Sequence, residues 1–501
     1  MPFFSVPQRF GMHVLAVVLG ACLLSQPTAQ AQPTGIPSMG SASGAELSPS
    51  LERTLGNAIM EQGRRSPEYI ADADVNQYLT QLGRKLAQYA PNLQQPITVF
   101  AMRDSSINAF ALPGGYIGIN SGLFTASRSE SELASVIAHE IGHVSQRHVA
   151  RGITQSAQSN HLMIAALAGA LLGALAGSAD LAIGAAAFGQ AAAVDRQLGF
   201  SRQAEQEADR VGFEMLRKAG FDTRGMVQMF QRLMANSRLN ESSNPNVYTS
   251  THPLTTQRLA DVENRVQAQG TSSHADSLSY VYLRTKLLVM QASSGQALRT
   301  VEQSLRSQAN TVDNALERSA AYYGLSYIAW TRQDYAQAQQ YLDEAYTGSH
   351  FQAAELDVLA IQISLREQNL AQAQRLSEQA WARWPDSEAV ALAYVQVLQQ
   401  GKRDAEAIQF LSQRIEQWPE LPRLYQLQAQ SYDRLGDGVR ARLAMAEYYQ
   451  LIGALPTAVD QLQQARNLTT DFYMQSEIDT QISYLRRRLE NERALLERFK
   501  S

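Results

Sequence analysis

The sequence predicts a mainly helical α+β fold, in which a domain with a small sheet is followed by an all-α solenoid of helical repeats. Three observations predict it. Two short strand-like segments lie near residues 100 and 117, helical hydrophobic spacing dominates the rest of the first half, and a period of about 34 residues runs through the second half. At about 150 residues per domain, 501 residues suffice for two large domains or three smaller ones.

Composition excludes several classes of protein. The formal net charge of −4 at pH 7 argues against a dedicated nucleic-acid-binding protein, which should be basic. Hydrophobic residues make up 45% and charged residues 18%, an ordinary globular balance. The one cysteine, Cys22, excludes both a disulfide framework and a thiolate metal cluster. Any metal must therefore be bound by histidine and carboxylate side chains.

Residues 1–31 are predicted to be a cleaved export signal. Arg9 precedes an apolar run at 12–24, and Ala-Gln-Ala at 29–31 is a small-residue cleavage site. A membrane anchor is one alternative, although the run of about 13 residues is shorter than the roughly 20 that a span needs. A lipoprotein signal is another, because residues 19–22 resemble a lipobox in which Cys22 would be acylated. Cleavage after Ala31 would leave no cysteine, which suits a periplasm.

Residues 32–269 are predicted to form the first domain. A lead-in rich in Pro, Gly and Ser ends where Ser48 can cap a helix that has Pro49 at its first position. The polar stretch at 270–277 is the expected domain boundary. The other elements expected in this half are a helix over 74–89 and strands over 96–102 and 116–119, the last entered through a Gly-Gly turn.

Residues 278–501 are predicted to form a tetratricopeptide repeat domain. Trp384-Pro385 and Trp418-Pro419 lie 34 residues apart, and pairs of small residues recur at steps of 35, 34 and 34 from Ala336 onward. This helix-turn-helix period, with small residues where helices cross, is typical of tetratricopeptide arrays. About four repeats are expected, with a capping helix over 473–500. A nonrepeating helical domain is the alternative.

His139-Glu140-Ile141-Gly142-His143 is an H-E-x-x-H motif in a stretch with helical apolar spacing. Because residues four apart share a helix face, both imidazoles can bind one Zn²⁺ ion. Glu140 is angularly offset and can take the proton of a water molecule that zinc acidifies. Two incidental histidines on a surface helix are the alternative. The motif thus predicts a peptide-hydrolysing zinc site.

A catalytic zinc site needs a third protein ligand and one open position. Glu205 and Asp209 lie four residues apart in another helical stretch and so share a face. We expect Glu205 to bind zinc and Asp209 to accept a hydrogen bond from the free N–H group of a ligating histidine. Glu207 is expected to be solvated, and His148, which lies off the ligand face, to have a structural role.

Together these motifs resemble the zinc metallopeptidases of the HtpX/Oma type. The similarity covers residues 108–265 and includes the segment Gly114-Gly115-Tyr116-Ile117 before the motif helix. The resemblance implies a gluzincin-like domain with one Zn²⁺ ion per chain. It also implies a role for His252, which Pro253 holds in an extended loop: this histidine would take the fourth zinc position and keep the enzyme latent.

Three further expectations concern substrate and surface. Arg258 is a candidate for stabilising the tetrahedral oxyanion, and a salt bridge that holds the His252 loop is the alternative. Gly115, Tyr116 and Ile117 are expected to form an edge strand on which an extended substrate pairs by strand addition, with a core strand as the alternative. The apolar run at 162–177 is expected to form a packed helical pair, or else to contact a partner or a membrane.

With its export signal and repeats, the whole chain resembles periplasmic members of this family. The resemblance implies a periplasmic zinc endopeptidase, in part at the outer membrane, that degrades misassembled outer-membrane β-barrel proteins and assists their assembly. It implies that the repeats bind the barrel assembly machinery. Two alternatives stay open: a zinc-stabilised chaperone or adaptor with negligible proteolysis, and a lipid-anchored processing protease that differs in the fate of Cys22.

Overall fold

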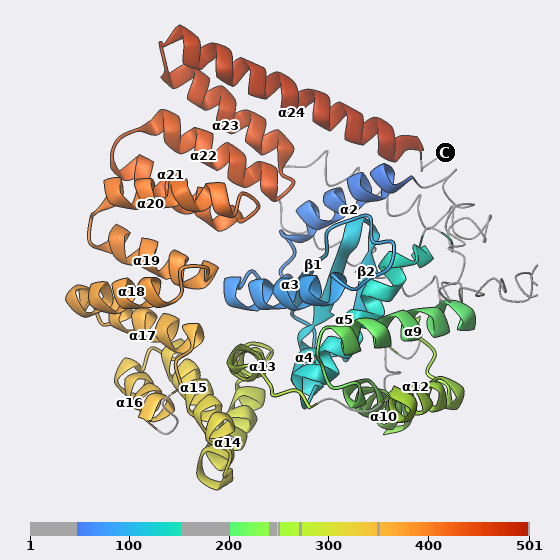
Figure 1. Ribbon diagram of the computed structural model, residues 1–501. Helices are drawn as coiled ribbons and strands as arrows, with labels where there is room; N and C mark the ends of the chain where they lie inside the picture. The colour runs from blue at the N-terminus through green and yellow to red at the C-terminus, as the bar shows by residue number, and fades with distance from the viewer. Residues whose placement is uncertain are drawn as a thin grey trace, which may run out of the picture. The chain divides into compact units, whose positions relative to one another are not determined.

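The computed structural model describes residues 48–149, 151, 201–239, 248, 251–269, 273–347 and 351–498 (Figure 1). The predicted export signal, including Cys22, and the apolar run at 162–177 lie outside these residues. Within the described ranges, no helix combines the length and the apolar character that crossing a membrane requires.

The N-terminal half contains a small sheet and the helices that pack on it. Its first helix, α2 (Pro49–Gly63), begins as predicted: the Ser48 side chain accepts a hydrogen bond from the N–H group of Leu51, and proline occupies the first turn. The next elements are α3 (Ala73–Ala87), β1 (Thr98–Met102), β2 (Ala109–Leu112), the 3₁₀ turn η3 (Pro113–Gly115) and β3 (Tyr116–Asn120). Strand β2 was not predicted, because four apolar residues show no alternation.

The strand order β1-β3-β2 corrects the predicted substrate edge. Strand β3 pairs with β1 in parallel and with β2 in antiparallel orientation, so Tyr116 and Ile117 have a neighbouring strand on both sides. Gly115 lies in the turn before β3 with a φ of 84°, a conformation that favours glycine. The prediction of an edge strand is therefore wrong for Tyr116 and Ile117, because β1 and β2 occupy the two sides of β3.

Helix α5 is the central element of this half. It packs against the sheet and against α3, α9 and α10, and almost all of its residues are buried. Two glycines allow its close approach to α9, since a Cβ atom on Gly142 would lie 2.9 Å from the Ala208 carbonyl oxygen and one on Gly212 would lie 3.0 Å from the His139 nitrogen. The helices of this region are α4 (Ser121–Ala126), α5 (Glu130–Ser145), α9 (Arg202–Lys218), α10 (Arg224–Leu239) and α12 (Thr256–Gln269).

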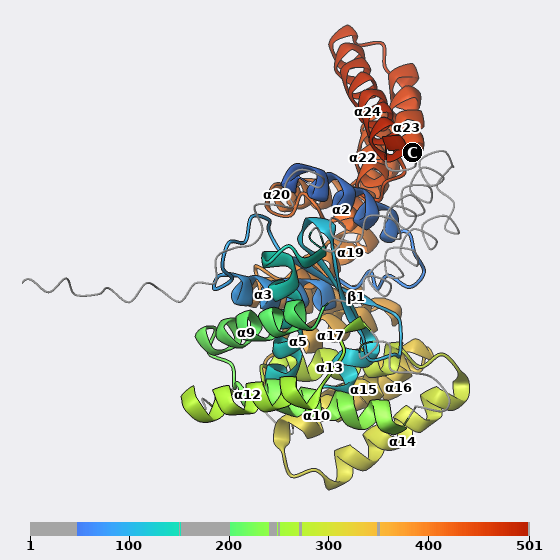
Figure 2. The same cartoon turned by 90° about the vertical axis from the view of Figure 1, so that its right-hand side faces the viewer.

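The C-terminal half is all-α, as predicted, and its helices follow one another in chain order from yellow to red (Figures 1 and 2). The second small residue of each pair that sets the repeat period is buried: Ala338, Ala373 and Ala407 are 0% exposed. Trp384 and Trp418 are the C-caps of α18 and α20. The helices are α13 (Leu278–Met290), α14 (Gly295–Thr311), α15 (Ala315–Thr331), α16 (Tyr335–Thr347), α17 (Ala354–Arg366), α18 (Leu370–Arg383), α19 (Glu388–Gln400), α20 (Asp404–Gln417), α21 (Pro422–Arg434), α22 (Gly438–Leu451), α23 (Leu455–Leu468) and α24 (Phe472–Arg498).

Two hydrophobic clusters cross the expected boundary at 270–277. Helix α13 contributes Tyr280 to the core around α5, where its ring stacks on Phe124 with centroids 5.7 Å apart. At the other end of the repeats, Leu462 and Ile478 share a cluster with Leu55 of α2. Both ends of the helical array are thus packed on the domain that carries the H-E-x-x-H motif.

Candidate metal centre

The two motif histidines project from α5 into the interior. His139 and His143 are one helical turn apart, and their Nε2 atoms lie 3.0 Å from each other. Their side chains are 1% and 0% exposed, so both imidazoles are buried. The helix begins at Glu130, where the Ser129 side chain accepts a hydrogen bond from the N–H group of Glu132.

Helix α9 brings two carboxylates to these histidines. The carboxylate oxygens of Glu205 lie 3.5 Å from His139 Nε2 and 3.4 Å from His143 Nε2. Asp209, one turn further on, has its Oδ1 atom 2.9 Å from His139 Nδ1. The i, i+4 spacing thus places one carboxylate at the converging nitrogens and the other behind one of them, as the sequence analysis expects.

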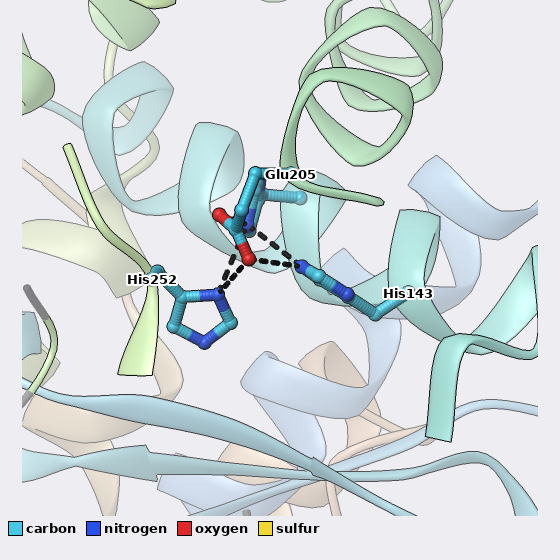
Figure 3. Close-up of side chains that lie close together, drawn as sticks. His143, Glu205 and His252 are labelled. Carbon is cyan, nitrogen blue, oxygen red and sulfur yellow. Dashed lines mark hydrogen bonds and ion pairs between the residues drawn. The ribbon is translucent and has the colours of Figure 1, made fainter. Parts of the chain in front are cut away.

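His252 joins the group from the segment before α12 (Figure 3). Its Nδ1 atom lies 3.0 Å from a Glu205 oxygen and 3.4 Å from His139 Nε2. The imidazole stacks on Tyr248, with ring centroids 4.7 Å apart and planes 27° apart. His139, His143, Glu205 and His252 each direct one donor atom at a common point, and these atoms all lie within 4.8 Å of one another.

The donor set fits a divalent metal ion. A tetrahedral ion with bonds of about 2.1 Å needs donor atoms roughly 3.4 Å apart, which is close to five distances between these side chains, 3.0–3.5 Å. The charges near the donor set are compatible with a cation: Glu205 and Asp209 are buried carboxylates, and Arg258 pairs with both of them. A bound cation would be stabilised by the negative charge that Arg258 leaves unbalanced.

Glu140 has the surroundings of a proton acceptor. Its side chain is 0% exposed, and within the described residues neither carboxylate oxygen has a hydrogen-bond partner. His252 Nε2 lies 3.7 Å from its Oε1 atom. Burial raises the pKa of Glu140, although the nearby His252 and His139 partly oppose this. A buried carboxylate without hydrogen bonds is costly, so this group is poised to bind a proton.

The two carboxylates of α9, Glu205 and Asp209, also influence the protonation of His139. Burial disfavours a charged imidazole, but hydrogen bonds to Asp209 and Glu205 outweigh it and raise the pKa of His139 to about 9. Burial opposes ionisation of Glu205 and Asp209 as well, and their histidine and arginine partners nevertheless lower the pKa of both. Burial lowers the pKa of His143 well below its usual value. Both carboxylates are therefore ionised and able to balance a metal cation.

Arg258 is engaged in buried ion pairs. Its Nε and Nη2 atoms donate to the two oxygens of Asp209 at 2.7 and 2.8 Å, and its Nη1 atom lies 2.6 Å from Glu205. The Nη1 group also donates to the Pro253 carbonyl oxygen at 2.9 Å. These contacts tie the His252 loop to α9 and favour the salt-bridge alternative over the oxyanion role for this residue.

Two residues come closer to the site than the sequence suggests. His148 Nδ1 lies 2.9 Å from His143 Nδ1, and His148 Nε2 lies 3.1 Å from a Glu207 oxygen. The expectation that Glu207 is solvated is therefore wrong, since its partners are His148 and Arg151. A turn after α5 brings His148 back, and no pattern of apolar residues signals that turn.

Comparison with known proteins agrees with this geometry. A family described as peptidase family M48 matches residues 73–266, and a tetratricopeptide repeat family matches residues 364–431. Over 264 residues the chain is 39% identical to the putative beta-barrel assembly-enhancing protease of Vibrio cholerae, covering 53% of this chain and 54% of that protein.

Two relatives match over nearly their full length. The beta-barrel assembly-enhancing protease of Yersinia pestis is 30% identical over 483 residues, which is 95% of this chain and 98% of that protein. The protein of the same name from Escherichia coli K12 is 31% identical over 494 residues, or 97% and 98%. With its M48 domain, its metal-ligand cluster and its repeats, the chain is a metallopeptidase that belongs to the beta-barrel assembly-enhancing protease family.

Proposed function

We propose that this chain is a zinc-dependent endopeptidase of the periplasm that degrades misassembled outer-membrane β-barrel proteins and assists their assembly. The observation that carries the proposal is the convergence of His139, His143, Glu205 and His252 beside the buried carboxylate of Glu140. Imidazole and carboxylate donors in tetrahedral spacing suit zinc, and one such group would bind one ion per chain.

Each residue has a defined task in this proposal. His139, His143 and Glu205 would hold the ion, and Asp209, whose Oδ1 atom lies 2.9 Å from His139 Nδ1, would orient that imidazole. When bound, zinc supplies Lewis-acid chemistry, which polarises a peptide carbonyl and acidifies water. Glu140 takes the proton of the attacking water and delivers it to the leaving amine. Its raised pKa suits both steps, because the protonated form must persist long enough to act as an acid.

We propose that His252 keeps the enzyme latent. Its Nδ1 atom is the fourth donor of the cluster, so a bound ion would have four protein ligands and no position for water or substrate. Stacking on Tyr248 and the Arg258 contact to Pro253 hold the loop in this place. Activation then requires only that the loop carrying His252 moves away from the ion.

The closed set of four donors also favours a second candidate function. Structural zinc sites are closed in this way, whereas catalytic sites keep one position open. A zinc-stabilised chaperone or adaptor with negligible proteolysis would have the same resting geometry. The identity of Glu140 argues for hydrolysis, because a structural site gains nothing from a buried carboxylate that lacks hydrogen bonds.

The relatives named above are called beta-barrel assembly-enhancing proteases, and this name supports the proposed role in barrel assembly. We propose that outer-membrane β-barrel proteins are the clients, and that the repeat helices bind the barrel assembly machinery, because tetratricopeptide arrays commonly bind proteins. A periplasmic location, in part at the outer membrane, would give the enzyme access to both.

The test compares purified chain without residues 1–31 and its Glu140→Gln variant on a misassembled outer-membrane barrel protein. We expect cleavage by the wild type, and a loss of about 100-fold or more in Glu140→Gln, because a general base contributes on that scale. A chelator should abolish cleavage and added Zn²⁺ should restore it. Glu140→Gln should still bind one zinc ion, because Glu140 is not one of the four converging donors.

The same assay separates the two candidates. If the wild type and His252→Ala both bind zinc and neither cleaves the client, the chaperone or adaptor function replaces the protease. If cleavage persists in Glu140→Gln or in chelator, the proposed mechanism is wrong.

A further inference from the structure

We propose that His148 and Glu207 are positioning residues for His143: they form a hydrogen-bonded relay that fixes the imidazole in the tautomer and orientation that metal binding needs. The inference rests on the proposed metal site and extends it to two side chains with no other assigned role. His148 is 2% exposed, and Glu207 lies on α9 beside it.

The relay depends on a turn in the backbone. In an uninterrupted helix, a residue five positions after His143 would point about 140° away from it. Helix α5 instead ends at Ser145, and Arg147 takes a left-handed conformation with a φ of 54°. This conformation is uncommon for arginine and costs free energy, so it persists only where the surroundings impose it. An ion pair of 3.3 Å between Arg147 and Glu52 of α2 anchors the turn.

The ring nitrogens can share protons in only one way if His143 binds a metal. Its Nε2 atom faces the converging donors and must offer a lone pair, so its proton lies on Nδ1. That N–H group donates to His148 Nδ1 at 2.9 Å. His148 then carries its proton on Nε2 and donates it to the Glu207 oxygen at 3.1 Å. Arg151 donates to the same oxygen at 2.9 Å and holds the end of the relay in place.

Helix α9 therefore serves both histidines of the motif. Asp209 contacts His139 Nδ1 directly, whereas Glu207 reaches His143 through His148. Positions 205 and 209 share a helix face, whereas position 207 points to nearly the opposite side of α9, about 160° from position 205. The returning turn after α5 places His148 on that other side. One helix thus supplies a ligand and the acceptors behind two further ligands, and it couples their orientation to its own packing on α5.

The experiment measures zinc affinity, by competition with a chromophoric chelator, for the chain without residues 1–31. His148→Phe keeps the volume of the side chain and removes both hydrogen bonds. We expect it to raise the zinc dissociation constant about 10- to 100-fold, as loss of a partner behind a metal ligand commonly does. Glu207→Ala leaves His148 in place and should raise the constant less, by about 3- to 10-fold.

A matched control is His274→Phe. His274 also pairs with a glutamate, Glu130, at 2.9 Å, but it does not contact any of the four candidate metal ligands. It should leave the zinc dissociation constant unchanged. To show that His148 acts through His143, His148→Phe is repeated in the His143→Ala background, where we expect less than a threefold effect.

The outcomes are distinguishable. A wild type that binds no zinc overturns the proposed function, and this inference with it. A wild type that binds zinc, with His148→Phe and Glu207→Ala binding it equally well, overturns this inference alone. An equal effect of His148→Phe in the presence and absence of His143 overturns it too. If His148→Phe lowers the melting temperature of the metal-free chain, the inference is judged on Glu207→Ala instead. An unchanged zinc dissociation constant in that variant then overturns it.

Discussion

Among single residues, His252 is the one proposed to restrain activity, because its imidazole fills the position that water and substrate need. His252→Ala should raise the rate of client cleavage about tenfold or more, since the competent fraction of the enzyme rises when the fourth donor is gone. Zinc should remain bound at one ion per chain, because His139, His143 and Glu205 still provide three ligands.

The measurement for this prediction is client or self-cleavage by the purified variant, with zinc content determined in parallel. His274→Ala is the control, since it removes a histidine that contacts Glu130 and none of the cluster. Equal rates for the wild type and His252→Ala, with zinc bound in both, would contradict the latency proposal.

Residues close in sequence were predicted well, and contacts made by tertiary packing were predicted less well. The spacing of His139 and His143 places both on one helix face, and Glu205 and Asp209 follow the same rule. For Arg258 the sequence left two equal interpretations, an oxyanion role and a salt bridge. Only its contacts to Asp209 and Pro253 distinguish between them.

At the scale of secondary-structure elements, the site depends on how closely α9 approaches α5. A Cβ atom on Gly212 would lie 3.0 Å from the His139 nitrogen and 3.1 Å from the Ala138 carbonyl oxygen, both of which are backbone atoms of α5. Gly212→Ala should therefore push the helices apart at a cost of about 1–3 kcal/mol. It should lower the melting temperature by several degrees and weaken zinc binding, because Glu205 moves away from the two histidines.

Gly295→Ala provides the reference for this prediction. Gly295 also lies in a helix, but the nearest atom to an added Cβ is the tip of the Arg299 side chain at 3.6 Å. The change should leave stability the same or slightly higher, since alanine restricts the unfolded chain more than glycine does. Thermal unfolding and zinc affinity are measured for both variants. If Gly212→Ala behaves like Gly295→Ala, the close packing of α9 on α5 does not determine the geometry of the metal site.

Elements themselves were predictable where a periodic pattern exists, and their arrangement was not. The repeat period followed from the spacing of small-residue pairs such as Ala371 and Ala373 and from the 34 residues between Trp384 and Trp418. The order of the strands has no local signal: β3 became central because the unpredicted β2 folds back on it. The contact of His148 with His143 was not predicted for a similar reason, since the left-handed turn at Arg147 lies between it and the motif.

At the scale of the whole described chain, buried charges join the metallopeptidase helices to the first repeats. Lys286 of α13 lies 2.7 Å from Asp72 and 3.2 Å from Asp74, at the start of α3. Glu355 of α17 is 4% exposed and belongs to the same electrostatic group, because Asp74 and Lys286 both influence it. Among the described residues, Asp72, Asp74 and Glu355 thus place three acidic groups around Lys286, an excess of acid over this lysine.

This excess makes the stability of the junction depend on pH. Burial, followed by repulsion from Asp74, raises the pKa of Glu355 from 4.5 to about 7. Between these values the folded chain binds a proton that the unfolded chain has lost, so the stabilisation present below pH 4.5 is lost as the pH rises through 7. Glu355→Gln, which keeps a neutral group, should therefore raise the melting temperature at pH 8 and change it little at pH 5. The effect on stability at pH 8 should be on the order of 3 kcal/mol, because each pKa unit corresponds to about 1.4 kcal/mol.

Thermal unfolding in the presence of a chelator, which removes metal binding from the comparison, measures this effect. Glu344→Gln, a change at an exposed position of α16, should show no such difference between the two pH values. A Glu355→Gln variant that shifts the melting temperature equally at both would show that Glu355 is ionised throughout in the folded chain.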